Sequence, residues 1–166
     1  MNQVNKTPLE FRQLVPDLRA QLEEFFLELH SNQDEKFFHP HPFTPEAADE
    51  ICRRVGRDLY YSALADNKIL GYGILRGWDE GFETPSLGIA IHPQARGLLL
   101  GAALMHFLHA AARQRGAQRI RLTVYKENYV ARRLFSKLGY EYEDSGSDKL
   151  VGFLDLGRRK ATHEAE

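Results

Sequence analysis

Apolar residues spaced three and four positions apart predict four helices in this chain. Thr44 followed by Pro45 is an N-cap with proline at the first helical position, and it marks the start of the second helix. Gly116 and Gly139 are glycines of the kind that commonly follow a helix end. The four helices are therefore expected at 17–30, 46–56, 98–115 and 128–139.

Strict alternation of apolar and polar residues predicts strands between these helices. The clearest case is RIRLTVY, in which Ile120, Leu122 and Val124 share one face. The turn Asp66-Asn67-Lys68 joins two further strands as a hairpin. The expected strands are 9–15, 58–65, 69–77, 86–92, 119–125, 140–144 and 149–156.

The order of these elements indicates an α/β fold with a mixed sheet. Strands and helices alternate, a hairpin lies in the middle, and a βαβ unit covers 86–125. We expect a single domain over 1–157, built on a central, mostly antiparallel twisted sheet of about seven strands flanked by four helices. The polar stretch 158–166 is expected to be a flexible tail.

Composition and charge exclude several classes of protein. The formal net charge of −1 gives no electrostatic reason to expect nucleic acid or an anionic lipid surface as a partner. No window resembles a membrane span, and MNQVNKTPLE is not expected to be a signal peptide. Cys52 is the only cysteine and is expected to be a small buried residue, so we expect a reducing, cytoplasmic location.

The stretch HPQARGLLLGAA at 92–103 places glycines around a helix start. Backbone N–H groups at such a start have no helical partner and, with the helix dipole, form an anion site. Gly97 lets the backbone approach a phosphate, and Arg96 adds a positive charge. The alternative is that Gly97 is only a loop residue and Gly101 only a close-packing residue.

A second motif follows this stretch, and the two motifs together resemble one known family of proteins. The stretch 86–141 resembles the GNAT superfamily, the acyl-CoA-dependent N-acyltransferases, through a Q/R-x-x-G-x-G/A signature and an N-x-x-A-x-x-L-[YF]-x-K-x-G-[FY] pattern. The first signature reads Arg96-Gly97-Leu98-Leu99-Leu100-Gly101, with Leu99 where the family usually has glycine. The second reads Asn128, Ala131, Leu134, Phe135, Lys137, Gly139 and Tyr140.

The resemblance implies that acetyl-CoA is the cofactor, with its pyrophosphate on the loop after residue 92. It also implies that backbone N–H groups around Ile89 to Ile91 polarise the thioester carbonyl, and that pantetheine pairs with that strand. A leucine at 99 can still donate its N–H if its φ is negative. The expected cofactor residues are Ile89, Ala90, Ile91, Arg96, Gly97, Leu98, Leu99, Leu100, Gly101, Ala102, Asn128, Ala131, Phe135 and Lys137.

The chemistry of amide formation needs a base for the amine, and a leaving thiolate benefits from an acid. Many relatives carry a tyrosine acid at the position of Phe135, which has no proton to give. Either the thiolate leaves with assistance from solvent or from Asn128, or another group serves as the acid. Tyr125 and Tyr129 are the nearest such groups in sequence, and each has a packing or surface alternative. The base candidates are Glu83, His39 and His41.

The acceptor cleft is expected between two aromatic and acidic segments, 37–44 and 76–93. Trp78 either stacks on a substrate ring or caps the core, and His106 and His109 are expected to be solvated.

The acceptor is expected to be the primary amine of a small molecule, such as an amino sugar in surface-polysaccharide synthesis. A polyamine-like amine, a protein N-terminus, and an acyl-CoA-binding module without turnover remain as alternatives. No metal is expected, and a homodimer is possible. The expected acceptor residues are His39, His41, Phe43, Trp78, Glu80 and Glu83.

Overall fold

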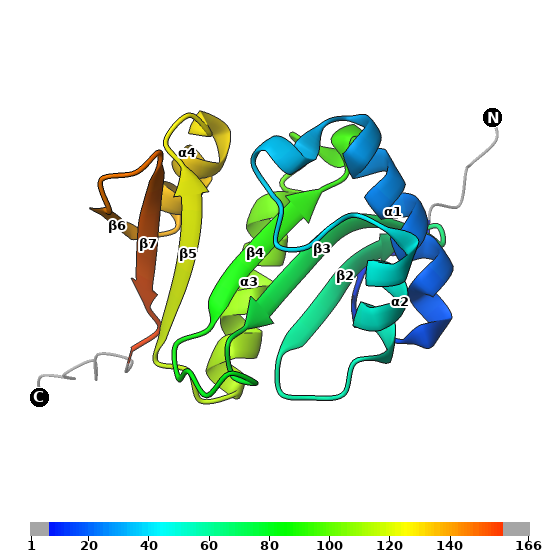
Figure 1. The fold of residues 1–166 in the computed structure, drawn as a ribbon, viewed down its shortest axis with the longest axis horizontal. Coiled ribbons are helices and arrows are strands. Elements are labelled where there is room, and N and C mark those ends of the chain that lie inside the picture. The colour runs from blue at the N-terminus through cyan, green and yellow to red at the C-terminus, as the bar shows by residue number, and fades with distance from the viewer. Residues whose placement is uncertain (1–6, 158–166) are drawn as a thin grey trace, which may run out of the picture.

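A computed structural model describes residues 7–157 as one seven-stranded sheet with helices on both faces (Figure 1). The expected tail, 158–166, lies outside the described residues. The strands are β1 (Glu10–Gln13), β2 (Leu59–Ala65), β3 (Lys68–Arg76), β4 (Ser86–Ile91), β5 (Arg119–Tyr125), β6 (Glu141–Asp144) and β7 (Lys149–Asp155). The helices are α1 (Arg19–Ser31), α2 (Pro45–Arg53), α3 (Leu100–Gln114) and α4 (Tyr129–Lys137), with short 3-10 turns η1 (Pro16–Leu18), η2 (Asp34–Lys36) and η3 (Pro93–Ala95).

The expected mixed, mostly antiparallel sheet is confirmed. Its strand order is β1-β2-β3-β4-β5-β7-β6, and β4 with β5 is the parallel pair. Several predicted bounds were too wide: the first strand is 10–13 rather than 9–15, and the third helix begins at Leu100 rather than at 98. That helix starts late because Leu99 has a left-handed backbone conformation, which a helix cannot continue.

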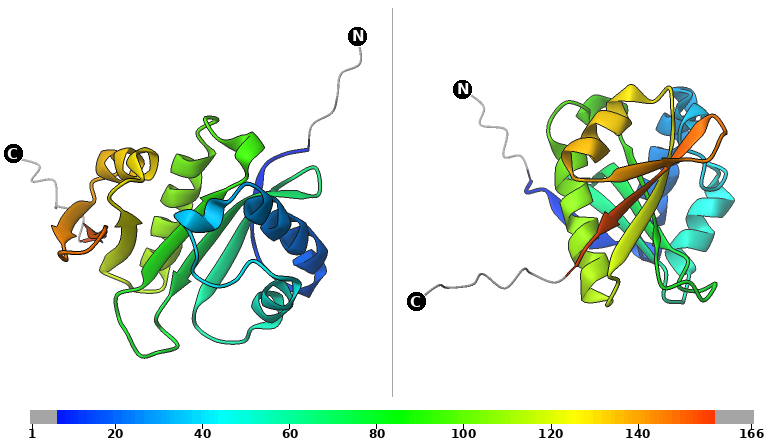
Figure 2. Two further views of the ribbon diagram at one scale, coloured as in Figure 1. Left: turned by 45° about the horizontal axis from the view of Figure 1, so that its top comes forward. Right: turned by 90° about the vertical axis from the view of Figure 1, so that its left-hand side faces the viewer.

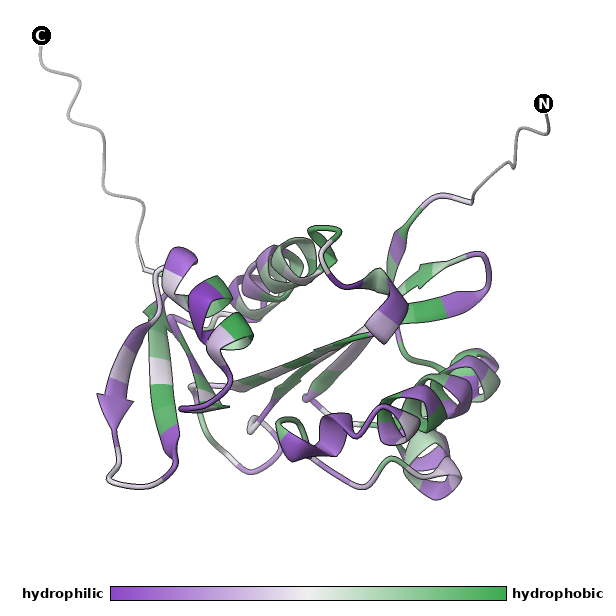
Figure 3. Cartoon of the chain, turned by 90° about the horizontal axis from the view of Figure 1, so that it is seen from above, coloured by the Kyte–Doolittle hydropathy of each residue, from purple (hydrophilic) through white to green (hydrophobic). Residues whose placement is uncertain are grey.

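The helices form two layers. Figure 3 shows α3 and α4 on one side of the sheet and α1 and α2 on the other, and the right-hand view of Figure 2 shows the same division from the end of the sheet. Gly71 and Gly73 of β3 allow α3 to pack closely, since a Cβ at Gly73 would lie 2.9 Å from a methyl carbon of Leu108. Cys52 is buried as expected, and burial raises the pKa of its thiol to about 11.

The parallel strands β4 and β5 touch at one end only. Their ladder contains the single pair Ser86 and Arg121, supported by a hydrogen bond from the Arg121 N–H to the Pro85 oxygen at 3.0 Å. Beyond this pair the two strands diverge toward the top of Figure 1. The sheet is therefore open along one seam, and the divergence leaves backbone groups of both strands free for another partner.

Two further sequence expectations concern the surface. Among the described residues, no helix is long and apolar enough to cross a bilayer. The expected homodimer stays a prediction. Of the two edges of the sheet, β6 carries exposed acidic residues (Glu141, Glu143 and Asp144), which oppose pairing with another acidic edge.

His109 was expected to be solvated, and this is wrong. It is a half-buried residue of α3, and its Nε2 lies 2.8 Å from the hydroxyl of Tyr140. Burial, with a smaller contribution from His106, lowers the pKa of His109 to about 4. The ring is therefore neutral in the folded protein at pH 7.

This buried histidine predicts a loss of stability in acid. Because the folded pKa lies below the ordinary value near 6.5, the unfolded chain binds the proton first. The free energy of unfolding should fall by about 1–2 kcal/mol between pH 6.5 and 4, after allowance for the partial exposure of the ring. Urea unfolding across this range will measure it. His109→Gln should flatten part of the slope, and His106→Gln, which removes only the smaller contribution to the shift, should flatten it less; an unchanged slope in His109→Gln would contradict the assignment.

Candidate active site

Unpaired backbone N–H groups gather where η3 leads into α3. In the described segment 96–102, no backbone N–H donates to a protein oxygen. Gly97 has φ 76° and Leu99 has φ 64°, with Leu98 between them at negative φ. This alternation turns successive N–H groups toward one side, which is the geometry of an anion-binding nest. The segment 96–102, called here the amide cradle, therefore has the geometry of an anion site, which is what the sequence expectation of a pyrophosphate there requires.

Leu99 departs from the sequence expectation, because its φ is positive. From the sequence, the Leu99 N–H was expected to be available as a donor if φ were negative, and that condition is not met. The loop nevertheless directs its backbone as a glycine would, because the leucine itself adopts the left-handed region at a cost of about 1–2 kcal/mol. Its side chain is 83% exposed, so packing does not offset that strain.

Leu99→Gly should therefore stabilise the protein. Relief of strain exceeds the extra chain entropy of glycine, so the free energy of unfolding should rise by about 0.5–1 kcal/mol. Leu98→Gly is a matched control, since Leu98 is also exposed but has negative φ, and it should lose stability. Urea unfolding will compare them; equal destabilisation of both variants would show that residue 99 is not held in the left-handed region.

Arg96 is engaged with protein groups in this structure. Its Nη2 lies 2.9 Å from Oδ1 of Asp34, and its Nε donates to the Ile91 oxygen at 3.1 Å. The side chain thus ties the cradle to η2, and a phosphate would have to compete with Asp34 for it. Lys137 is exposed on α4.

The start of α4 is built by a cap. The Asn128 side chain accepts a hydrogen bond from the Ala131 N–H at 3.3 Å, which fixes the first turn. Tyr129 is 72% exposed, does not line the pocket described below, and lies over the guanidinium of Arg132. Phe135 is 6% exposed and packs in the core between α3, α4 and the sheet. Asn128 therefore acts first as a helix cap.

The strand facing the seam contributes both backbone and packing. Ala90 is 8% exposed and packs toward α1, while Ile89 and Ile91 are half-buried and pack toward α3. These three residues lie in the part of β4 that has left β5, so their backbone groups on that side have no strand partner. The geometry suits the expected pairing with an amide-containing chain.

A pocket of about 740 Å³ lies on the α1–α2 side of the seam. Its floor comes from β4, β5 and β7, and its walls come from 37–40 and from the β3–β4 loop. The segment 37–43 passes in front of β3 and β4 in Figure 1. The helices α1 and α2 cover only the β1–β4 part of the sheet, so β5 and β7 remain accessible from this side.

His39 and Tyr125 meet within this pocket. Nε2 of His39 lies 2.6 Å from the Tyr125 hydroxyl, although the residues are far apart in sequence. The Lys149 ammonium lies 4.8 Å from the centre of the Tyr125 ring. Of the expected acid and base candidates, these two are the ones that the structure brings into contact in the pocket.

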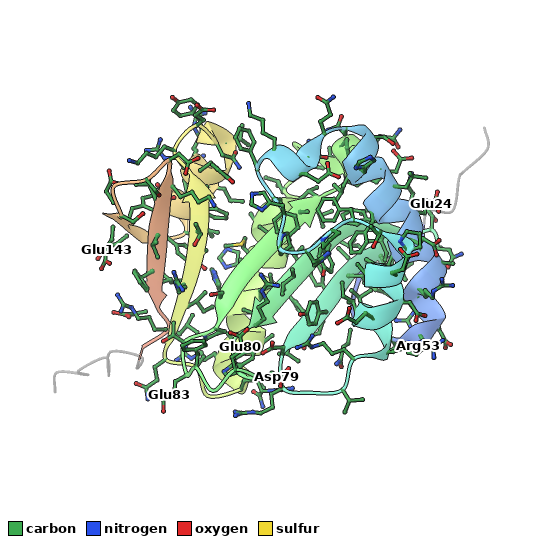
Figure 4. The ribbon with its side chains drawn as sticks, viewed as in Figure 1. Glu24, Arg53, Asp79, Glu80, Glu83 and Glu143 are labelled. Atoms are coloured by element: carbon green, nitrogen blue, oxygen red, sulfur yellow. The ribbon has the colours of Figure 1, made fainter. Side chains whose placement is uncertain are left out.

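The other expected base candidates lie elsewhere. His41 donates or accepts at the Tyr72 hydroxyl, 2.9 Å away, and burial lowers the pKa of its imidazole. Phe43 packs on the core with Phe26, 5.2 Å between ring centres. Glu80 and Glu83 line the pocket from the β3–β4 loop, at the lower edge of the molecule in Figure 4. Glu83 is exposed there and lies near the start of β4 rather than near Ile89 to Ile91.

Trp78 belongs to the core rather than to the acceptor site. It is 5% exposed and packs with the residues of α3 and β4, so the packing alternative holds and substrate stacking is wrong. Asp58, whose side chain is 2% exposed, holds this loop by accepting from the N–H groups of Gly77 at 2.9 Å and Asp79 at 3.2 Å. Asp79 accepts in turn from the Arg57 N–H at 2.7 Å, and this bond lowers the pKa of its carboxyl.

Three cationic residues of the pocket were not expected from the sequence: Arg76, Arg121 and Lys149. For Arg121 a signal existed, because it shares the polar face of the alternating strand with Tyr125. For Arg76 and Lys149 the sequence carries no comparable signal, since only the pairing of the strands places them beside the seam.

Comparison with known proteins agrees with this geometry. Residues 22–140, more than half of the chain, match the family model described as the acetyltransferase (GNAT) family. The chain belongs to the GNAT family. The resemblance seen in the two sequence motifs is thereby confirmed, and GNAT enzymes use acyl-CoA as donor.

Solved structures share the fold at low sequence identity. The GNAT domain of PAT from S. lividans has a TM-score of 0.76 at 15% identity, covering 89% of this chain and 90% of that one. The PaiA N-acetyltransferase of Thermoplasma acidophilum, solved with coenzyme A, has a TM-score of 0.74 at 19% identity, covering 89% and 99%. The ribosomal-protein-S18-alanine N-acetyltransferase of Escherichia coli has a TM-score of 0.69 at 16% identity, covering 93% and 98%. These similarities establish the GNAT fold of the chain.

Proposed function

We propose that this GNAT protein transfers an acetyl group from acetyl-CoA to the primary amine of a small molecule by direct attack in a ternary complex. The observation that carries the proposal is the open seam between β4 and β5, which has the amide cradle at one end and the pocket on its α1–α2 side. Donor and acceptor can therefore approach the seam separately and meet there. The PaiA relative solved with coenzyme A supports this use of the fold.

The His39–Tyr125 pair is proposed to accept the proton that the attacking amine loses. Acetyl-CoA supplies an activated thioester, and attack forms the new C–N bond as the C–S bond breaks. The Tyr125 hydroxyl accepts the proton that the amine loses and passes its own to Nε2 of His39, 2.6 Å away. The coenzyme A thiolate leaves without a dedicated acid, since a thiol is a good leaving group near neutral pH. This arrangement accounts for a phenylalanine at 135.

The charges of the pocket bear on the choice of acceptor. A polyamine-like acceptor is disfavoured because the three cations of the lining, Arg76, Arg121 and Lys149, outnumber its two carboxylates, Glu80 and Glu83. An amino sugar, including one linked to a nucleotide in surface-polysaccharide synthesis, fits the aromatic and cationic lining. A protein N-terminus, as in the S18-alanine relative, stays a candidate for the same panel of acceptors.

A second candidate is an acyl-CoA-binding module without turnover. Two observations favour it: Leu99 at a position that is usually glycine, and Phe135 at the position of the acid in many relatives. The two candidates differ in whether any amine is acetylated once the cofactor is bound.

Thermal unfolding with and without acetyl-CoA tests the donor half of the proposal. At about 100 times its Kd, the ligand should add about 2.7 kcal/mol of stability. Leu98→Glu places a negative charge in the amide cradle and should abolish the shift, whereas Leu27→Glu, at an exposed leucine of α1, should retain it. Acetylation of a panel of primary amines then tests transfer. If millimolar acetyl-CoA does not raise the melting temperature, the proposal that the chain binds acyl-CoA is wrong. A rise in melting temperature without acetylation of any amine would favour the acyl-CoA-binding module without turnover.

A further inference from the structure

Two arginines stand in one row across the floor of the pocket. The register pairs Arg76 of β3 with Ser86 of β4, and Ser86 with Arg121 of β5. Cross-strand partners point to the same face of a sheet, and all three residues line the pocket. With strands about 4.8 Å apart, the two arginine Cα atoms lie about 10 Å from each other, with the Ser86 hydroxyl between them.

These guanidinium groups are not neutralised by the protein. The ion pairs of residues 7–157 include neither Arg76 nor Arg121, although five other arginines of the same region are paired with carboxylates. Arg76 donates one N–H to the Pro40 oxygen at 3.1 Å and is half-buried. Arg119, two residues before Arg121, pairs with Asp155 at 3.5 Å. Glu80 and Glu83 line the same pocket, but neither forms an ion pair with Arg76 or Arg121 within residues 7–157. Positive charge that is not paired beside a substrate site suits an anionic ligand.

We propose that Arg76 and Arg121 bind an anionic group, carboxylate or phosphate, of the amine that this enzyme acetylates. The inference rests on the proposed function and specifies its acceptor. Guanidinium groups bind both anions in a planar, two-point manner, and Ser86 adds a hydroxyl donor.

The same row sets the spacing between the two ends of the acceptor. Tyr125 lies four residues beyond Arg121 on β5, about 13 Å along the strand. The amine must reach the His39–Tyr125 pair while the anion stays at the arginine row. The acceptor therefore has several bonds between amine and anion, as in an ω-amino acid or an amino-sugar phosphate, rather than the short spacing of an α-amino acid.

Matched pairs of acceptors test the inference with the full chain and acetyl-CoA. The pairs are 6-aminohexanoate with hexylamine, and glucosamine 6-phosphate with glucosamine, which separate carboxylate from phosphate. The anionic member of at least one pair should have a kcat/KM about 10- to 100-fold higher. Arg121→Gln should erase this preference by raising KM for the anionic member, and Arg121→Lys should restore part of it. The control Arg12→Gln, on β1 at the far edge of the sheet, should leave the preference unchanged.

Calorimetric binding of the same compounds in the presence of coenzyme A separates this inference from the proposed function. Binding of an anionic amine that Arg121→Gln weakens, without acetylation, would support the arginine row and overturn the transferase. Equal use of both members of each pair, or equal loss of both in Arg121→Gln, would overturn the arginine row while acetylation itself stands. Absence of both binding and acetylation would overturn both.

Discussion

His39→Ala is expected to lower kcat/KM for acetyl transfer by about 100- to 10,000-fold, because it removes the group that accepts the amine proton through Tyr125. Tyr125→Phe should cost a similar factor, since it breaks the same path. The double variant should be little worse than either single one, because the two residues act as one unit. Steady-state kinetics with saturating acetyl-CoA will measure all three.

The control for this prediction is another exposed histidine. His106→Ala on α3 removes an imidazole outside the pocket and should leave kcat/KM within twofold. Additive losses in the double variant would show that His39 and Tyr125 act separately, and the proton path would then be wrong.

Asp58→Ala is expected to lower the free energy of unfolding by about 3 kcal/mol, because it leaves the buried N–H of Gly77 and the partly buried N–H of Asp79 without an acceptor. The substitution also removes the ion pair with Arg54, 3.7 Å away. Because this carboxylate fixes the β3–β4 loop, which forms a wall of the pocket, KM for the acceptor should rise as well.

Urea unfolding and acceptor kinetics below the melting temperature will test the loop anchor. Glu143→Ala, an exposed acidic residue on β6, is the matched control and should change stability by less than about 0.5 kcal/mol. Asp58→Asn retains one acceptor oxygen and should lose less than the alanine variant. If Asp58→Ala unfolds at the same urea concentration as Glu143→Ala, the carboxylate does not anchor the loop.

Much of the fold follows from local pattern. The alternation in β5 and the helical spacing in α1 depend on which residues are apolar, so they are visible in the sequence. The two family motifs likewise predict the loop before α3, because that loop has a similar backbone geometry across the family. The bounds of α3 were less visible, because propensity does not reveal that Leu99 takes a left-handed conformation.

The pocket depends on contacts that local pattern does not contain. His39 lies in a loop and Tyr125 in a strand, and the sheet topology brings them together. The sequence around either residue does not indicate that the other is its partner. Trp78 shows the converse difficulty: an aromatic residue in an acidic loop has the composition of a binding site, yet its indole fills the core. The strand register places Arg76 and Arg121 in one row across the sheet, and register is a long-range property that local sequence does not reveal.

The seam between β4 and β5 has a consequence for turnover of the protein in the cell. Because the two halves of the sheet share a single residue pair, the β5–β7 unit is held to the rest chiefly by apolar packing against α3, and local opening at the seam breaks few strand hydrogen bonds. A ligand that bridges the seam opposes this opening in proportion to its concentration relative to Kd. Proteases act on the opened form, so we expect a bound acyl donor to slow proteolysis of this chain.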